Sequence, residues 1–395
     1  MRFPEFSGDW EKYRVSDILE FYPTNALSWD QLEYDGGECL NLHYGLIHNG
    51  LPVQVDLSKD SLPSIKSDFF PKKYTLCQDG DIAFADASED TNDVGKAIEF
   101  YNCSGKDAVC GLHTIHGRDK LGITVPGFKG YVFSSKVFHD QIKTIAQGTK
   151  VFSIKASNFD EVVLSIPSKE EQTKISKLLM AIDERISAQS KIIEELTTLR
   201  SALIEKCSKQ SGALFDLSDI LQEVDERSTV ANQYQVLSST VKGIFYQKEY
   251  FNKDLASEDN KGYKVVRRGH VVLSPQNLWM GNINYNDRFD IGIVSPSYKV
   301  YSIRDGFNPI FITSLLRTKK ALYEYMLASE QGASIVRRNL NVEAFMVIKF
   351  RIPDSRQQDS LSIAINAINA KLNNERTILE RLTMQKYSLL ENMFI

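Results

Sequence analysis

Two stretches of the chain, Ser168 to Cys207 and Asp354 to Met393, carry the same amphipathic pattern at a constant offset of 186 residues. In each stretch, apolar residues recur every seven positions in two rows on one helical face, as the seam of a coiled coil requires. The polar interruption of the seam also matches, because Gln189 corresponds to Glu375. The sequence therefore predicts an internal two-fold repeat in which each half ends in a long helix.

A helix of about 40 residues is roughly 60 Å long, so it extends beyond a small domain and needs a partner for its apolar seam. The two copies predict an antiparallel intramolecular coiled coil, whereas the alternative is that each helix packs flat on its own globular neighbour. The predicted seam residues are Ile175, Leu179, Ile182, Ile186, Ile193, Leu196, Leu203, Leu361, Ile365, Ile368, Leu372, Leu379, Leu382 and Leu389.

The two helices have matching starts. Ile166 to Ser168 followed by Glu171 predicts a capping box, and Ile352 to Asp354 followed by Gln357 predicts its counterpart. These starts give four predicted segments in an α+β fold: a β-rich domain over 1–167, a helix over 168–209, a second β-rich domain over 210–352, and a second helix over 353–395.

A weaker duplication continues outside the helices. Val15 to Leu19 corresponds to Leu217 to Leu221, and the β-run Gly80 to Phe84 corresponds to Gly269 to Leu273. The loop after the first β-run is acidic and polar, whereas the loop after the second is rich in amides. A shared scaffold with unlike loops predicts two binding domains that read different ligands.

Composition restricts the class of protein. The chain has 395 residues, a formal net charge of -4, and five cysteines without a CxxC motif. No apolar run approaches a membrane span, and the start of the chain lacks a secretory segment, so we expect a reduced cytoplasmic protein. The Cys/His groups in Cys39 to His48 and Cys110 to His116 lack the paired spacing of a zinc site, and no metal is predicted.

Catalytic motifs are also absent from the sequence. Gly105-Lys106 lacks the glycine spacing and the Ser/Thr of a phosphate-binding loop, and no GxGxxG follows a predicted strand. No run resembles the motif of the amino-methyltransferases. We therefore expect a non-enzymatic chain without a cofactor.

Several segments resemble one family, the DNA-specificity subunits of Type I restriction-modification systems. They are Arg2 to Phe6, Trp10-Glu11, Ile182 to Ile186, Asn284-Tyr285 and Ile293 to Tyr298. The resemblance implies two target-recognition domains that each read half of a split double-stranded DNA target. It also implies that two adenine methyltransferase subunits dock on the helices and that restriction and translocase subunits join them.

The resemblance leaves one rival of another class. A non-enzymatic scaffold, with two ligand-binding β-domains on a coiled-coil strut, agrees better with the acidic net charge. It does not account for the family-like start of the chain or for the helix starts.

The loops after the two β-runs are the predicted base readers, because amides suit adenine, arginines suit guanine or phosphate, and lysines suit phosphate. The alternative is that these side chains merely cap turns. The predicted DNA-binding residues are Lys72, Lys73, Ser88, Asp90, Asn92, Lys96, Arg267, Arg268, Gln276, Asn277, Asn282, Asn284, Arg337 and Arg338.

Overall fold

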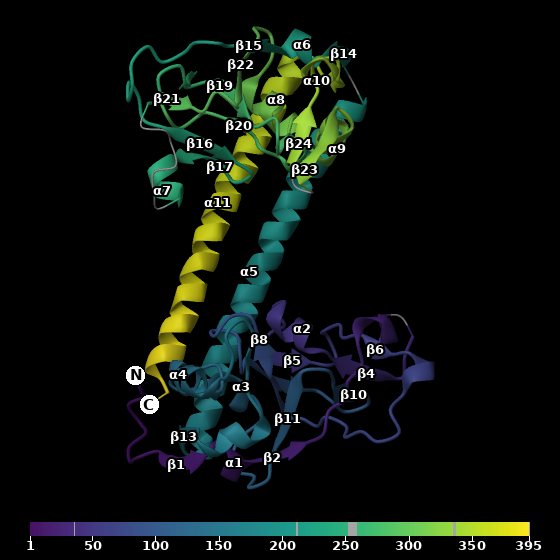
Figure 1. Cartoon of the computed structure of the whole chain (residues 1–395), viewed down its shortest axis with the longest axis vertical. Helices are drawn as coiled ribbons and strands as arrows, with labels where there is room; N and C mark the ends of the chain where they lie inside the picture. Colours follow the sequence, from purple (N-terminus) through teal and green to yellow (C-terminus); the bar gives the residue numbers. More distant parts are fainter. Residues whose placement is uncertain (35, 211, 252–258, 335–336, 395) are drawn as a thin grey trace. The chain divides into compact units, whose positions relative to one another are not determined.

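The computed structural model describes residues 1–34, 36–210, 212–251, 259–334 and 337–394. Its contacts divide the chain into two compact units (Figure 1). The first unit comprises Met1–Ser190 with Thr377–Ile395, and the second comprises Lys191–Arg376. Each of the two long helices, α5 (Lys169–Gln210) and α11 (Ser355–Asn392), therefore contributes residues to both units.

The first unit is built mainly of short strands. In chain order these are β1 (Glu11–Arg14), β2 (Leu19–Tyr22), β3 (Leu32–Glu33), β4 (Cys39–Leu42), β5 (Gln54–Asp56), β6 (Ser64–Ile65), β7 (Ile82–Ala85), β8 (Ala87–Ser88), β9 (Ala97–Tyr101), β10 (Asp107–Cys110), β11 (Thr114–Asp119), β12 (Phe152–Ser153) and β13 (Val163–Ile166). Its shorter helices are α1 (Val15–Ile18), α2 (Tyr44–His48), α3 (Lys129–Val132) and α4 (Lys136–Ile145), with 3-10 turns η1 (Trp29–Gln31), η2 (Ser67–Phe69) and η3 (Ala156–Asp160).

The second unit has a similar composition of elements. Its strands are β14 (Ala213–Asp216), β15 (Leu221–Glu223), β16 (Leu237–Thr240), β17 (Gly243–Tyr246), β18 (Lys264–Arg267), β19 (His270–Leu273), β20 (Ile283–Tyr285), β21 (Ile291–Val294), β22 (Lys299–Ile303), β23 (Ser329–Ser334), β24 (Arg337–Leu340) and β25 (Lys349–Ile352). Its shorter helices are α6 (Leu217–Ile220), α7 (Gln247–Phe251), α8 (Pro309–Leu315), α9 (Lys319–Leu327) and α10 (Val342–Met346), with the 3-10 turn η4 (Leu278–Met280).

The predicted duplication is present in the sheet topology. The first unit has a sheet in the order β2-β11-β7-β9-β5, and the second has one in the order β15-β22-β19-β20. The first four strands of the two sheets match in order and are antiparallel throughout. The predicted β-runs form β7 and β19 at equivalent places in these sheets. Just before each long helix, β13 pairs with β1 and β25 pairs with β14. The predicted α+β fold is confirmed.

The two long helices pack antiparallel within the first unit. Lys386 of α11 makes an ion pair of 2.6 Å with Asp183 of α5. Trp10 donates a hydrogen bond to Glu171 near the start of α5, and its ring contacts that of Phe394, which follows α11. The first turns of α5 therefore lie beside the last turns of α11, as in an antiparallel pair. The apolar side chain of Leu389 joins one hydrophobic cluster with those of the first turns of α5.

Antiparallel contact is also present within the second unit. The guanidinium of Arg200 donates to the Asn369 side chain at 2.8 Å, and Ile204 shares a hydrophobic cluster with Ile365. Every predicted seam residue is buried or half-buried. Neither long helix, nor any other helix within the described residues, combines the length and the apolar character needed to span a membrane.

The first predicted capping box is only partly correct. The Ser168 hydroxyl accepts the Glu171 backbone N–H, and the Asp354 carboxylate accepts that of Gln357, as expected. However, the buried Glu171 carboxylate does not turn back to the backbone of Ser168. It accepts two hydrogen bonds from the Arg2 guanidinium instead, because a bidentate ion pair is stronger than a single bond to a backbone N–H.

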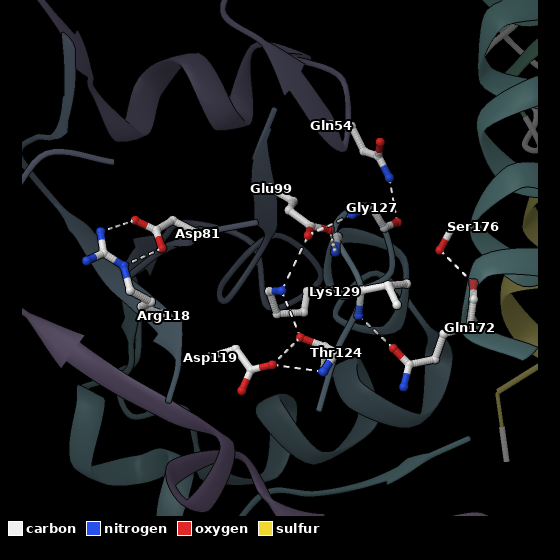
Figure 2. A network of polar contacts seen from close by, with 12 residues as sticks. Gln54, Asp81, Glu99, Arg118, Asp119, Thr124, Gly127, Lys129, Gln172 and Ser176 are labelled. Carbon is white, nitrogen blue, oxygen red and sulfur yellow. Dashed lines mark hydrogen bonds and ion pairs between the residues drawn. The ribbon is translucent and has the colours of Figure 1, made fainter. Parts of the chain in front are cut away.

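A buried glutamine one turn into each long helix ties that helix to its unit. The Gln172 side chain, labelled in Figure 2, accepts the backbone N–H of Val125. It also donates to the carbonyls of Ile123 and Pro167. At the equivalent position, the Gln358 side chain accepts the N–H of Asn308 and donates to the carbonyl of the proline before the helix. The repeat thus extends to individual hydrogen bonds.

Behind the Gln172 contact lies a buried charge network in the first unit (Figure 2). The Lys129 ammonium lies 3.5 Å from the Glu99 carboxylate and donates to the Thr124 hydroxyl at 2.9 Å. Glu99 also accepts the backbone N–H groups of Gly127 and Gly130. Burial raises the pKa of the Glu99 carboxyl, and the nearby ammonium opposes part of that shift. This network fixes the loop that receives Gln172.

We predict that Gln172→Ala lowers the free energy of unfolding by about 2 kcal/mol, because it leaves buried backbone groups without partners. Gln358→Ala should have a similar effect in the second unit. Gln385→Ala, at an exposed position of α11, is the matched control and should change stability by less than about 0.5 kcal/mol. Urea unfolding of the three variants measures these differences, and equal stability of all three would contradict a bridging role for the glutamines.

Candidate nucleic-acid interface

In the second unit, three segments meet beside the end of β19: the β16–β17 hairpin, the segment 274–282, and the β23–β24 hairpin (Figure 1). The Asn282 amide donates to the Ser239 carbonyl at 3.0 Å, which joins the first two segments. The Arg338 backbone N–H donates to the Gln276 carbonyl at 3.0 Å, which joins the second and third. We refer to these three segments, with the start of α9, as the second-unit loop surface.

The second-unit loop surface contains a concave site. The lining of a cavity of about 340 Å³ includes the amide residues Gln276, Asn277 and Asn282 and the aromatic residues Tyr250 and Phe251. Gln276 and the two aromatic residues are exposed. Polar amides and aromatic rings around one hollow can contact both the edge and the face of a planar ligand.

Two of the predicted readers, Asn282 and Asn284, are buried. The Asn282 side-chain oxygen accepts the Ser239 hydroxyl, and the Asn284 amide donates to the carbonyl of Thr240. The Asn284 oxygen also accepts a hydrogen bond from the Arg317 guanidinium at 3.2 Å. In this conformation both side chains hold the hairpin in place, and neither is available to a base.

Arg267 and Arg268 are exposed at the end of β18, and both make ion pairs. Arg267 lies 2.7 Å from the Glu226 carboxylate, and Arg268 lies 2.9 Å from that of Asp290. The hydrogen bonds from Arg267 lower the pKa of the Glu226 carboxyl. These ion pairs reduce the positive charge that the two arginines present to a phosphate.

Arg337 and Arg338 have different environments although they are adjacent in β24. The Arg338 guanidinium donates to the carbonyls of Met326 and Ser329 at the end of α9, which is a capping role. Arg337 is exposed, and the described part of the chain offers its side chain no partner.

Three further exposed cations belong to the second-unit loop surface, and they were not among the predicted DNA-binding residues. Lys319 and Lys320 begin α9, which packs against η4. Lys242 lies at the turn of the β16–β17 hairpin, next to Val241, whose carbonyl accepts the Arg317 guanidinium. The surface therefore carries a local positive charge although the whole chain is acidic.

The equivalent loop of the first unit, after β7, is stabilised by its own side chains. The Ser88 hydroxyl accepts the Asp90 backbone N–H, and the Asp90 carboxylate accepts the backbone and side-chain N–H groups of Asn92. Lys96 makes an ion pair of 3.1 Å with Asp93. These contacts are the turn-capping arrangement that was the alternative to base reading.

A second exposed segment of the first unit combines basic and aromatic side chains. Lys72 and Lys73 are exposed, and no described residue makes an ion pair with either. The neighbouring rings of Phe70 and Tyr74 are also exposed and lie edge to face at 5.1 Å. The sequence predicted the lysines, but it did not single out the aromatic residues beside them.

No protein-family model matches the chain. One curated relative, the specificity subunit of the Type I restriction enzyme MjaIX from Methanocaldococcus jannaschii, is 26% identical over 203 residues. That match covers 48% of this chain and 42% of the relative, so it spans less than half the length of the relative.

Two solved structures have a similar fold over nearly the whole chain. The S subunit of a Type I restriction-modification system from M. genitalium matches with a TM-score of 0.55 and 16% identity, covering 100% of this chain and 99% of that one. A chain from a structure of Type I restriction-modification complex assembly and conformational transition matches with a TM-score of 0.53 and 13% identity, covering 98% and 97%. The chain is thus similar in fold to these two solved structures, and about half of it is similar in sequence to part of one curated specificity subunit.

Proposed function

We propose that the chain is the DNA-specificity subunit of a Type I restriction-modification complex and that it reads a target in two separated parts. The observation that carries this proposal is the repeated scaffold with unlike loops at the same place in both copies. In each unit, a hairpin-like segment bonds to the loop after the equivalent strand, through Ile154 and Asp86 in one unit and through Arg338 and Gln276 in the other. Two copies of one frame that present different side chains suit two different half-targets.

In the second unit, the proposed contacts with DNA are of two kinds, to phosphates and to base edges. Exposed cations such as Arg337, Lys319 and Lys320 suit DNA phosphates, whereas the Gln276 amide, which lines the cavity, suits the edge of an adenine. The buried side chains of Asn282 and Asn284 hold the β16–β17 hairpin of this surface through hydrogen bonds. Asn277, Arg267 and Arg268 remain candidates for contact, although each already has a hydrogen-bond partner in the structure.

In the first unit, Lys72 and Lys73 are the strongest candidates for phosphate contact because their ammonium groups are exposed. Ser88, Asp90, Asn92 and Lys96 would support the shape of the loop, and Asp90 is exposed enough to accept a hydrogen bond from cytosine. The rival function, a scaffold for other ligands, gives no reason for exposed cations to gather on loop surfaces of an acidic chain.

The long helices are proposed to set the distance between the two half-targets. They contain 42 and 38 residues, so each is roughly 60 Å long. Successive major grooves on one face of DNA lie about 34 Å apart, which such a length accommodates. An uninterrupted helix resists bending, and this suits a fixed spacing between two half-targets.

The outward faces of the helices are the proposed docking surfaces for methyltransferase subunits, with restriction and translocase subunits joining the complex. Ile363, Met384 and Tyr387 of α11 and Leu199 of α5 are exposed apolar side chains on these helices. Exposed charged residues also lie on α5, including Lys174, Arg185, Glu194 and Glu195. Protein–protein interfaces typically combine apolar side chains with charged ones at the edge. Catalysis would then lie in the partner subunits, and this chain would not be an enzyme.

The variant Lys319→Ala with Lys320→Ala and Arg337→Ala should weaken DNA binding to all sequences alike. The slope of the logarithm of affinity against the logarithm of salt concentration should fall by about 0.9 for each phosphate that the variant no longer neutralises. The control, Lys349→Ala with Arg351→Ala, removes exposed cations from β25, which pairs with β14 and is not one of the segments of the loop surface. Fluorescence anisotropy at several salt concentrations measures both, and an unchanged slope in the triple variant would remove this surface from the interface.

Inserting one heptad after Ser190 and one after Arg376 should lengthen the unread spacer of the target by about three base pairs. Seven helical residues add about 10 Å, and stacked base pairs rise about 3.4 Å. Methylation-sensitive sequencing of a host that carries the variant reports the new motif. A heptad in only one helix mismatches the seam and is the control, because it should abolish methylation. An unchanged spacer in the double insertion would exclude the helices as the measuring element.

Met384→Glu with Tyr387→Glu should prevent co-purification of the methyltransferase subunit, because it places charge in an apolar contact. Both residues are exposed, so circular dichroism and the thermal midpoint of the chain alone should stay unchanged. Gln385→Glu, between them and also exposed, is the control and should retain the partner. Normal recovery of the methyltransferase with the double variant would show that this face does not dock it.

A further inference from the structure

Two cysteines and a histidine from separate segments meet in the interior of the first unit. Cys77, Cys110 and His116 are 5%, 2% and 0% exposed, and one ligand atom from each lies within 4.8 Å of the others. Cys110 ends β10, and His116 lies in β11 of the other large sheet. Cys77 follows an isolated β-bridge between Leu76 and Val109. The cluster therefore joins three stretches of backbone.

The histidine of this cluster is held in one orientation. Its Nε2 lies 2.8 Å from the Asp81 carboxylate, which also accepts two hydrogen bonds from the Arg118 guanidinium (Figure 2). An N–H at Nε2 donates to that carboxylate, so the lone pair is on Nδ1. Nδ1 is buried and has no hydrogen-bond partner among the described residues. A buried nitrogen without a partner costs stability, and metal-binding histidines commonly donate their other N–H to a carboxylate in this way.

The spacing of the two sulfurs fits a tetrahedral metal ion. The sulfur atoms of Cys77 and Cys110 are 3.7 Å apart. Two thiolates at about 2.3 Å from a tetrahedral zinc ion are separated by about 3.8 Å. Two thiolates and a neutral imidazole also cancel the charge of a divalent ion, so the occupied site is neutral and suits a buried position.

We propose that Cys77, Cys110 and His116 form a structural site for a thiophilic divalent metal ion, with zinc as the principal candidate. Binding releases the two thiol protons to solvent and forms two metal–sulfur bonds and one metal–nitrogen bond. One tetrahedral position remains for a neutral donor such as a water molecule, which keeps the occupied site uncharged. The ion would connect β10, β11 and the segment before β7, and thus join the two large sheets of the first unit.

The site predicts on the order of one zinc ion per chain when the full-length protein is produced with zinc and purified under reducing conditions. Mass spectrometry of the metal content measures this ratio. Cys77→Ser with Cys110→Ser should lower the zinc content to near zero. Cys39→Ser is the matched control, because Cys39 is also buried but belongs to a different hydrophobic cluster, and it should retain the ion.

Two measurements on the unaltered chain keep the test independent of whether the variants fold. Cobalt substituted for zinc should show the charge-transfer absorption of a cobalt thiolate, and a chelator should lower the thermal midpoint and release the metal. A zinc-free chain after purification with excess zinc would overturn the proposal. So would a cobalt spectrum without thiolate absorption, or a Cys77–Cys110 disulfide in protein freshly isolated from reducing conditions.

Discussion

The fold depends on the apolar stripe along each long helix. This stripe is longer than the strands and short helices of one unit can cover. Each long helix is anchored at its start by a buried glutamine, Gln172 or Gln358, that bonds to backbone groups of its own unit. Beyond that anchor, the stripe is covered by the other helix, as the contacts of Asp183 with Lys386 and of Arg200 with Asn369 show within the respective units. Because one chain carries both stripes, the pairing is intramolecular, and its entropic cost is that of closing a loop within one chain.

The helices and the repeat were predictable because their signal is local and periodic. A seven-residue spacing can be read directly along the chain, and it correctly indicated buried or half-buried positions throughout both helices. The duplicated glycine-led runs also predicted the correspondence of β7 with β19, whereas the order of the strands around them is known only from the structure. The first capping box was half correct, because the partner of Glu171 is Arg2, which lies 169 residues away in sequence.

The candidate sites were less predictable because their contacts are distant in sequence. The Asn282 amide is hydrogen-bonded to Ser239, and Arg267 forms an ion pair with Glu226. Neither partner can be identified from the neighbouring sequence. The sequence grouped Cys110 with His113 and His116, but His113 faces Asp86 whereas Cys77 completes the buried cluster. Residue type and spacing alone could not separate side chains that form a surface from those that hold it in position.

The segment 1–10 contacts both long helices within the first unit. The Trp10 indole N–H donates to Glu171 of α5, and its ring packs on that of Phe394, which follows α11. The Met1 amino group also donates to the Asn392 carbonyl in the last turn of α11. One short segment thus covers the start of one helix and the end of the other, so local unfolding of this segment exposes both helix ends to water together.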